Sequence, residues 1–184
     1  EVRSLVGIIP LYAAERLELG WLETFSEFRK RLEWFLENRQ DLVQSCCYPL
    51  QHEKDTSLVL TIFDQNQLLR LLERIFNSGE FLSEFGVRSL SKVHADSPFR
   101  FGEREVRYEP AESECKIKGG NSNWRGPIWF PTSFLIIESL KKLSKAYPST
   151  FKVTKPDGTQ STFSELAEDL ANRLISIFTR DERG

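Results

Sequence analysis

A long apolar stripe near the carboxyl end constrains the fold of this chain more than any other feature. Apolar residues recur there at three- and four-residue steps from Phe163 to Phe178, the spacing that the buried face of an α-helix requires. Thr162 precedes the stripe and Glu165 follows three positions later, so these two residues form a capping box at the amino end of a helix. The segment therefore predicts a well-defined amphipathic helix.

Four further segments carry helical patterns. We expect one helix over residues 10–19 and a second over residues 23–38, whose phenylalanines and leucines fall on one face. Asp64 is expected to cap a third helix, which ends before Gly79. A fourth helix is predicted over residues 131–145, because proline suits the first helical turn and lysines suit the negative carboxyl end.

The intervening stretches are less regular. Residues 40–56 are predicted as a loop, and the apolar run at 58–63 is typical of a strand or an extended link. Residues 81–123 lack periodicity, and a loop of that length in a compact domain is often functional. Pro156-Asp157-Gly158 indicates a turn between two extended pieces. We therefore predict one domain over residues 1–184, all-α in class, in which α/α-hairpins are joined by long loops with a minor β-hairpin.

Composition excludes several classes of function. The 184 residues include 25 Lys and Arg against 27 Asp and Glu, a net charge of −2, whereas nucleic-acid-binding proteins usually show a basic excess. No apolar run approaches the roughly 20 residues of a membrane span, and no secretory leader is recognisable. The chain lacks methionine and opens on Glu1, so we expect it to derive from a longer polypeptide.

The metal-binding and redox residues show no functional spacing. His52, His94 and the three cysteines at 46, 47 and 115 do not match a zinc site. An odd cysteine count fits a reducing compartment, so a cytoplasmic location is expected. Neither a phosphate-binding loop nor a dinucleotide fingerprint is present, and no cofactor is predicted.

The strongest functional signal lies at residues 119–131, Gly-Gly-Asn-Ser-Asn-Trp-Arg-Gly-Pro-Ile-Trp-Phe-Pro. Glycines and prolines there favour a stiff, tightly turned backbone, on which Trp124, Arg125 and Trp129 are placed outside any helical stripe. An indole face packs on the C–H face of a sugar ring, and a guanidinium donates to oxygens in fixed directions. A sugar-binding loop and a structural loop whose tryptophans fill the core are equally compatible with this pattern.

Carboxylates that could assist hydrolysis lie just upstream, at Glu109, Glu112 and Glu114. Glycoside hydrolysis with inversion needs two carboxyl groups about 6.5–9.5 Å apart. Glutamates in a long loop are more often solvated, however, so the pattern does not identify a catalytic pair.

Residues 120–131 resemble the tryptophan-arginine-glycine-proline-isoleucine-tryptophan signature of glycoside hydrolase family 63, in particular its large microbial members. Supporting matches lie at residues 2–13 (VRSLVGIIPLYA), 31–39 (RLEWFLENR) and 86–91 (GVRSLS), the last followed by Asp96-Ser97-Pro98-Phe99. Around residues 112–118 the chain departs from the more glycine-rich stretch of the family.

The resemblance implies a carboxy-proximal fragment of an (α/α)6 toroid that hydrolyses α-glucosidic or related α-glycosidic bonds of an oligosaccharide with inversion. It implies that Trp124, Arg125 and Trp129, with Asn123 and Gly126, line the sugar pocket. It also implies that the aspartic acid and the glutamic base lie outside these residues, so that the fragment alone is inactive and its catalytic residues are unknown. A non-catalytic carbohydrate-binding or scaffold remnant is the alternative. A truncated toroid would leave apolar helix faces exposed, which predicts self-association.

Overall fold

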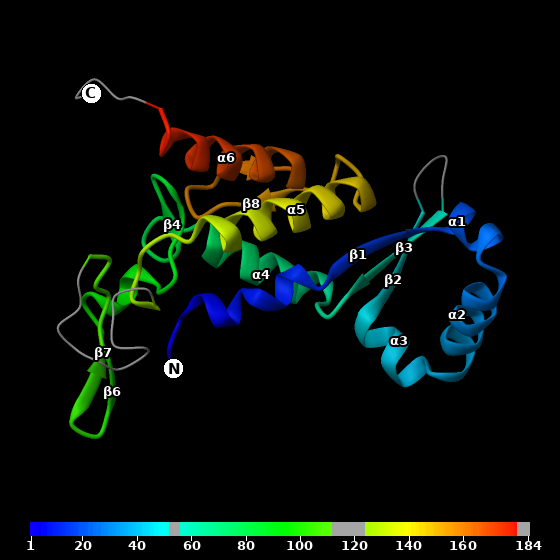
Figure 1. Cartoon of the computed structure of the whole chain (residues 1–184), viewed down its shortest axis with the longest axis horizontal. Helices are drawn as coiled ribbons and strands as arrows, with labels where there is room; N and C mark the ends of the chain where they lie inside the picture. Colours follow the sequence, from blue (N-terminus) through cyan, green and yellow to red (C-terminus); the bar gives the residue numbers. More distant parts are fainter. Residues whose placement is uncertain (52–55, 112–123, 180–184) are drawn as a thin grey trace.

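The computed structural model describes residues 1–51, 56–111 and 124–179, and it shows a helical body from which an arm projects (Figure 1). The body contains α4 (Gln65–Ile75), α5 (Phe130–Ala146) and α6 (Phe163–Ser176). The arm contains a three-stranded sheet and the helices α1 (Leu19–Thr24), α2 (Ser26–Asn38) and α3 (Gln40–Cys46). The structure therefore confirms a mostly helical fold, to which it adds a sheet.

Helices α5 and α6 pack side by side and form the centre of the body (Figure 1). The predicted capping box of α6 is confirmed, because Thr162 Oγ1 accepts from the backbone N–H of Glu165 and the Glu165 carboxylate accepts from the N–H of Thr162. Leu140 of α5 and Leu166 and Leu170 of α6 are fully buried. Burial of each such side chain stabilises the fold by about 2 kcal/mol.

Helix α4 contributes side chains to the same core, and it begins at the predicted cap. Asp64 Oδ1 accepts from the N–H of Gln67 at 2.7 Å, and Gln67 Oε1 accepts from the N–H of Asp64 at 3.0 Å. The helix ends at Ile75, before Gly79, and its buried residues Leu68, Leu72 and Ile75 join the same core.

The prediction of a helix over residues 10–19 is wrong. The short 3-10 helices Leu5–Gly7 and Ile9–Tyr12 are followed by strand β1 (Ala14–Glu18). Strand β1 pairs antiparallel with β3 (Thr56–Thr61), in the register Ala14 with Thr61 and Glu18 with Ser57. The long-range pairing satisfies the backbone groups of residues 14–18 that face β3 and overrides the local preference of these residues.

The expected loop over residues 40–56 is also wrong in its described part. Residues 40–46 form α3, and Cys47–Gln51 form β2, which pairs with the other edge of β3. The sheet order is β1-β3-β2. Residues 58–61 of the apolar run thus lie in the central strand, as the first of the two alternatives expected, and Ile62 and Phe63 follow its end.

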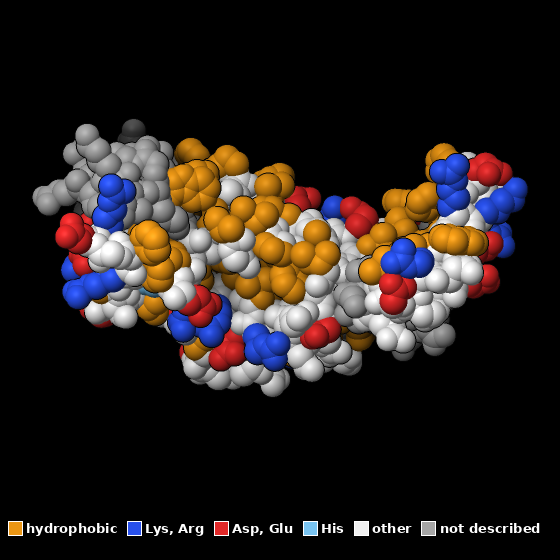
Figure 2. Space-filling view, turned by 90° about the horizontal axis from the view of Figure 1, so that it is seen from below, with side chains coloured by type: hydrophobic (Ala, Val, Ile, Leu, Met, Phe, Trp, Pro, Cys, Tyr) orange, Lys and Arg blue, Asp and Glu red, His pale blue; other side chains and the backbone are white. Residues whose placement is uncertain are grey.

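The helix expected over residues 23–38 exists, but it is divided and its apolar face is not buried. Helix α1 ends at Thr24, Phe25 leaves the helical conformation, and α2 starts at Ser26. No residue of α2 is buried, and Phe25 and Phe28 are 62% and 48% exposed. Figure 2 shows hydrophobic side chains gathered along the arm and over the middle of the body.

The irregular stretch from residue 81 contains short antiparallel pairs rather than one open loop. They are β4 (Leu82–Ser83) with β5 (Gly86–Val87) and β6 (Phe99–Phe101) with β7 (Arg104–Val106), with a 3-10 helix at Lys92–His94 between them. The predicted minor hairpin is confirmed as β8 (Val153–Thr154) with β9 (Gln160–Ser161). Among the described helices, none is long and apolar enough to cross a membrane.

Candidate functional site

The tryptophan-rich loop is held against the segment 86–91 at the amino end of α5. The N–H of Gly126 donates to Ser89 Oγ at 3.0 Å, and the N–H of Ser89 donates to the carbonyl of Pro127 at 3.0 Å. Arg88 and Ile128 form an isolated antiparallel bridge. Two segments that were singled out separately in the sequence therefore lie side by side.

Arg125 points into the interior of the protein. Its side chain is 0% exposed, and its Nη1 lies 3.3 Å from Glu109 Oε2. The N–H of Glu109 also donates to the carbonyl of Arg125 at 2.7 Å. A buried guanidinium needs an opposite charge and hydrogen bonds, so Glu109 helps to fix the loop by pairing with Arg125.

The two tryptophans of the loop contact each other. The ring centroids of Trp124 and Trp129 are 4.4 Å apart and the rings are tilted by 54°. Both side chains are partly buried. Asn123, the remaining predicted sugar contact on this side of the loop, lies outside the described residues.

Gly126 contacts Tyr108 in a way that requires glycine, and its position in the sequence did not reveal this contact. Its φ is +136°, and a Cβ built on it would lie 2.3 Å from Cε2 of Tyr108. The Tyr108 ring therefore packs directly on the backbone of the loop, a contact that any side chain at position 126 would prevent.

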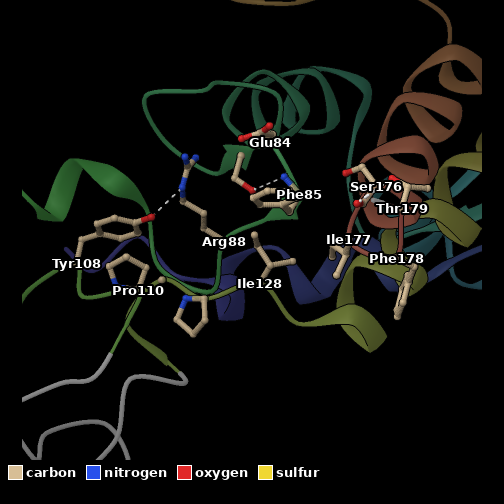
Figure 3. A pocket seen from close by; sticks show the side chains of 13 residues that line it. Glu84, Phe85, Arg88, Tyr108, Pro110, Ile128, Ser176, Ile177, Phe178 and Thr179 are labelled. Atoms are coloured by element: carbon tan, nitrogen blue, oxygen red, sulfur yellow. Dashed lines mark hydrogen bonds between the residues drawn. The ribbon is translucent and has the colours of Figure 1, made fainter. Parts of the chain in front are cut away.

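A cavity of about 1020 Å³ lies beside this contact (Figure 3). It is bounded by the loop, the β4–β5 turn, residues 108–110 and the end of α6. Its lining includes Gly126, Pro127 and Ile128, together with Ser83, Glu84, Phe85, Arg88, Tyr108, Pro110, Ser176, Ile177, Phe178 and Thr179. The loop thus reaches the cavity through Gly126, Pro127 and Ile128, whereas Trp124, Arg125 and Trp129 are not among its lining residues.

Arg88 and Tyr108 are two of the cavity residues that the sequence did not identify as site residues. Arg88 Nε donates to Tyr108 Oη at 3.0 Å, and Arg88 Nη1 donates to the backbone carbonyls of Leu82 and Ser78. Arg88 lies in the GVRSLS match at residues 86–91. That match indicated that the segment belongs to the family pattern, but it did not indicate that Arg88 lines a cavity. Tyr108 carries no local pattern, because only the folded chain brings it to Gly126.

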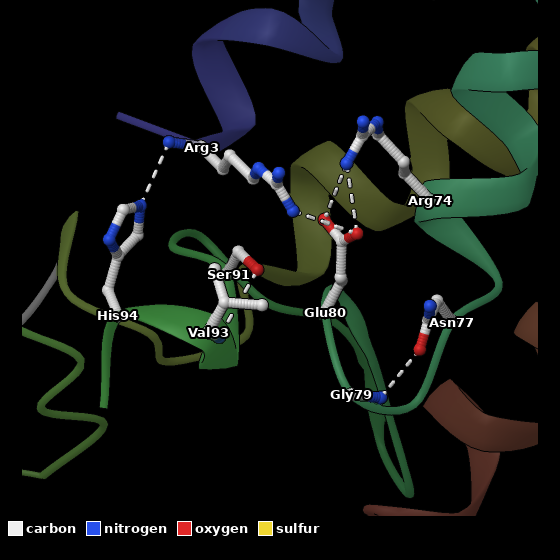
Figure 4. A network of polar contacts seen from close by, with 8 residues as sticks. All are labelled: Arg3, Arg74, Asn77, Gly79, Glu80, Ser91, Val93 and His94. Carbon is white, nitrogen blue, oxygen red and sulfur yellow. Dashed lines mark hydrogen bonds and ion pairs between the residues drawn. The ribbon is translucent and has the colours of Figure 1, made fainter. Parts of the chain in front are cut away.

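His94 has a structural role. The backbone N–H of Arg3 donates to His94 Nε2 at 3.0 Å, and Nδ1 lies 3.0 Å from the carbonyl of Ser97. Nε2 is therefore the acceptor and Nδ1 the donor of a neutral ring. The Arg3 side chain extends to Glu80, which also pairs with Arg74, each at 3.0 Å (Figure 4). These contacts connect the first residues of the chain to α4 through Glu80 and Arg74, and to His94.

Within the described part of the chain, no group of His, Cys, Asp and Glu side chains could hold a metal ion. Of the three upstream glutamates, Glu112 and Glu114 lie outside the described residues, and Glu109 pairs with Arg125.

Comparison with known proteins identifies the family. The model of the glycosyl hydrolase family 63 C-terminal domain matches residues 56–182. The chain is also 43% identical over 190 residues to Uncharacterized protein YMR196W of Saccharomyces cerevisiae; the match covers 100% of the chain and 18% of that relative. No solved structure matches. The chain therefore belongs to glycosyl hydrolase family 63, which confirms the resemblance noted in its sequence.

Proposed function

We propose that this chain is the carboxy-proximal part of an α-glycosidase that hydrolyses α-glucosidic or related α-glycosidic bonds with inversion. The observation that carries the proposal is the position of the family's signature loop, whose Gly126, Pro127 and Ile128 form one wall of a cavity of about 1020 Å³. Ligand pockets commonly have volumes of about 300–1,000 Å³. The chain spans 18% of the length of its yeast relative, so the substrate and activity proposed are those of a longer polypeptide.

In this proposal the chain supplies walls of the sugar site and not the pair of proton-transfer groups. An aspartic acid before residue 1 would protonate the leaving oxygen, and a glutamate after residue 184 would activate water from the opposite face of the ring. The helices of the body, α5 and α6 among them, would form one sector of an (α/α)6 toroid. Residues 1–184 alone would therefore be inactive.

A non-catalytic carbohydrate-binding or scaffold remnant is the second candidate. The burial of Arg125 and its pair with Glu109 favour it, because this arginine then stabilises the loop instead of contacting substrate. The carbohydrate-binding form shares the saccharide cavity with the enzyme and lacks a working acid and base, whereas the scaffold form binds no sugar.

The exposed aromatic residues of the arm support self-association as a further part of the proposal. Trp21, Phe25 and Trp34 are each more than half exposed, and large exposed apolar surfaces usually mark contacts with other chains or segments. Sedimentation should then show more than a monomer. The proposed location of the protein is the cytoplasm.

The test is hydrolysis by the longer polypeptide. Nitrophenyl α-glucoside and a set of α-linked disaccharides are incubated with the folded protein, and released sugar is measured against a heat-unfolded control. Turnover of any of them supports the enzyme. No turnover by folded protein, together with a sugar-dependent change in tryptophan fluorescence that Trp124→Ala abolishes, supports the binding remnant. No turnover and no fluorescence response contradict the enzyme and the binding remnant and support the structural scaffold.

A further inference from the structure

The cavity beside the loop has aromatic side chains at both of its ends. Figure 3 shows Tyr108 at one end and Phe178 at the other, with Arg88, Glu84 and Phe85 between them. Aromatic faces pack on the C–H faces of sugar rings, and they lose little side-chain freedom when they do so because they have only two rotatable bonds. Two such faces at separate ends suit a ligand with more than one ring.

Tyr108 is rigidly held before any ligand arrives. Its ring rests on Gly126, its hydroxyl accepts from Arg88 Nε at 3.0 Å, and its backbone N–H donates to the carbonyl of His94 at 3.1 Å. A platform fixed by three independent contacts costs little ordering entropy on binding. The family's signature glycine thus acts on the cavity by positioning Tyr108.

Phe178 forms the opposite end by packing against the start of α5. Its ring meets Phe130 edge to face, with centroids 5.8 Å apart and an angle of 77°. Phe178 remains 76% exposed, so the described residues leave most of its surface uncovered. Phe85, on the β4–β5 turn, is 40% exposed and lines the same cavity.

The polar groups of the cavity suit hydroxyl groups rather than a charged ligand. Among the described lining residues, Glu84 and Arg88 are the charged ones, and their charges cancel. Ser83, Ser176 and Thr179 add neutral hydroxyls. A ligand with alternating hydroxyl and C–H surfaces matches this lining better than a phosphorylated or acidic sugar does.

We propose that this cavity binds a neutral α-linked oligosaccharide of at least two units, with Tyr108 and Phe178 as stacking platforms for different rings. The inference rests on the proposed function and deepens it. It assigns sugar contact to Tyr108, Arg88 and Phe178, whereas Arg125 supports the loop from within.

The test is equilibrium titration of the longer polypeptide with methyl α-glucoside and with sulfur-linked, non-hydrolysable analogues of α-1,4- and α-1,6-linked glucose di- and trisaccharides, because the proposed enzyme would cleave the oxygen-linked sugars. Tyr108→Ala and Phe178→Ala are compared with Phe101→Ala, a matched control because Phe101 is 77% exposed and lies outside the cavity lining. Each cavity variant is expected to raise the dissociation constant of the trisaccharides roughly five- to tenfold. Phe101→Ala is expected to change nothing.

The length of the ligand separates the two platforms. One of the two variants should weaken trisaccharide binding while leaving the affinity for methyl α-glucoside unchanged, because a single ring occupies only one end. If Tyr108→Ala fails to fold, Tyr108→Phe is used in its place. This variant keeps the aromatic ring, so it should retain most of the affinity for the trisaccharides.

The inference is overturned if no sugar binds, or if Phe178→Ala weakens trisaccharide binding no more than Phe101→Ala does. Hydrolysis with dissociation constants insensitive to the cavity variants overturns this inference and leaves the proposed enzyme intact. Binding that depends on Tyr108 and Phe178 without any hydrolysis supports the cavity and contradicts the enzyme.

Discussion

Replacement of Gly126 by alanine tests the link between the signature loop and the cavity. An alanine Cβ would lie 2.3 and 2.6 Å from two ring carbons of Tyr108, distances that real contacts do not reach. The backbone of Gly126 also has a φ of +136°, which residues with a side chain rarely adopt. The substitution must therefore shift either the loop or the Tyr108 ring.

The expected cost follows from these two contributions. Backbone strain of this kind costs about 2 kcal/mol, and overpacking of a filled contact costs about 2 kcal/mol more. The free energy of unfolding should fall by about 4 kcal/mol in total. Gly158→Ala is the matched control, since Gly158 also has a positive φ, +83°, but its Cβ would meet nothing within 4 Å; strain alone should cost about 1 kcal/mol there.

Thermal unfolding compares the clash and the larger backbone strain at Gly126 with the smaller strain alone at Gly158. A difference of about 3 kcal/mol corresponds to a Tm lower by about 6–12 °C for Gly126→Ala than for Gly158→Ala in a cooperative unit of this size. Tyr108 should also lose its hydrogen bond with Arg88, so sugar affinity should drop in Gly126→Ala but not in Gly158→Ala. Equal Tm values for the two variants would refute the contact between the loop and Tyr108.

Three further predictions concern stability. Glu109→Ala removes the carboxylate that pairs with the buried Arg125 and should lower the free energy of unfolding by about 3 kcal/mol in urea titrations; a loss below about 1 kcal/mol would contradict a structural role for the pair. Leu140→Ala, at a site with 0% exposure, should cost about 3 kcal/mol, whereas Leu135→Ala, at 44% exposure, should cost less than about 0.5 kcal/mol; similar costs would place the core elsewhere. Burial raises the pKa of Tyr12 from 10.0 to about 12, so the unfolded chain releases this proton first and stability should fall as the pH rises from about 10 to about 12. Tyr12→Phe should reduce that alkaline loss of Tm, and an unchanged loss would show that Tyr12 does not cause it.

The helical body could be predicted because its signals are local. The caps at Asp64 and Thr162 and the stripe from Phe163 each lie within a few turns of one helix, so the hydrogen bonds and packing they predict do not depend on distant segments. The sheet of the arm could not be predicted in the same way. Residues 14–18 become a strand because they pair with residues 57–61, which lie 39 to 47 positions further along the chain.

The same difference between local signals and long-range contacts applies to the candidate site. Local composition located the loop from Trp124 and also gave its turn geometry at Gly126, since glycine and proline act on their own backbone. The partners of the loop come from distant positions, however, and no local pattern indicated that Tyr108 packs on Gly126 or that Arg125 is buried against Glu109. The side chains that face the cavity therefore differ from those that the motif drew attention to.

In the proposed function, the signature loop shapes the saccharide site of an inverting α-glycosidase. The most direct measurement is proton NMR of the sugar released by the longer polypeptide from an α-linked trisaccharide in the first minutes of reaction. We expect the β-anomer to be formed first, and we expect Tyr108→Ala to slow its release more than Phe101→Ala does. Release of the α-anomer, or no release by folded protein, would contradict the proposed function.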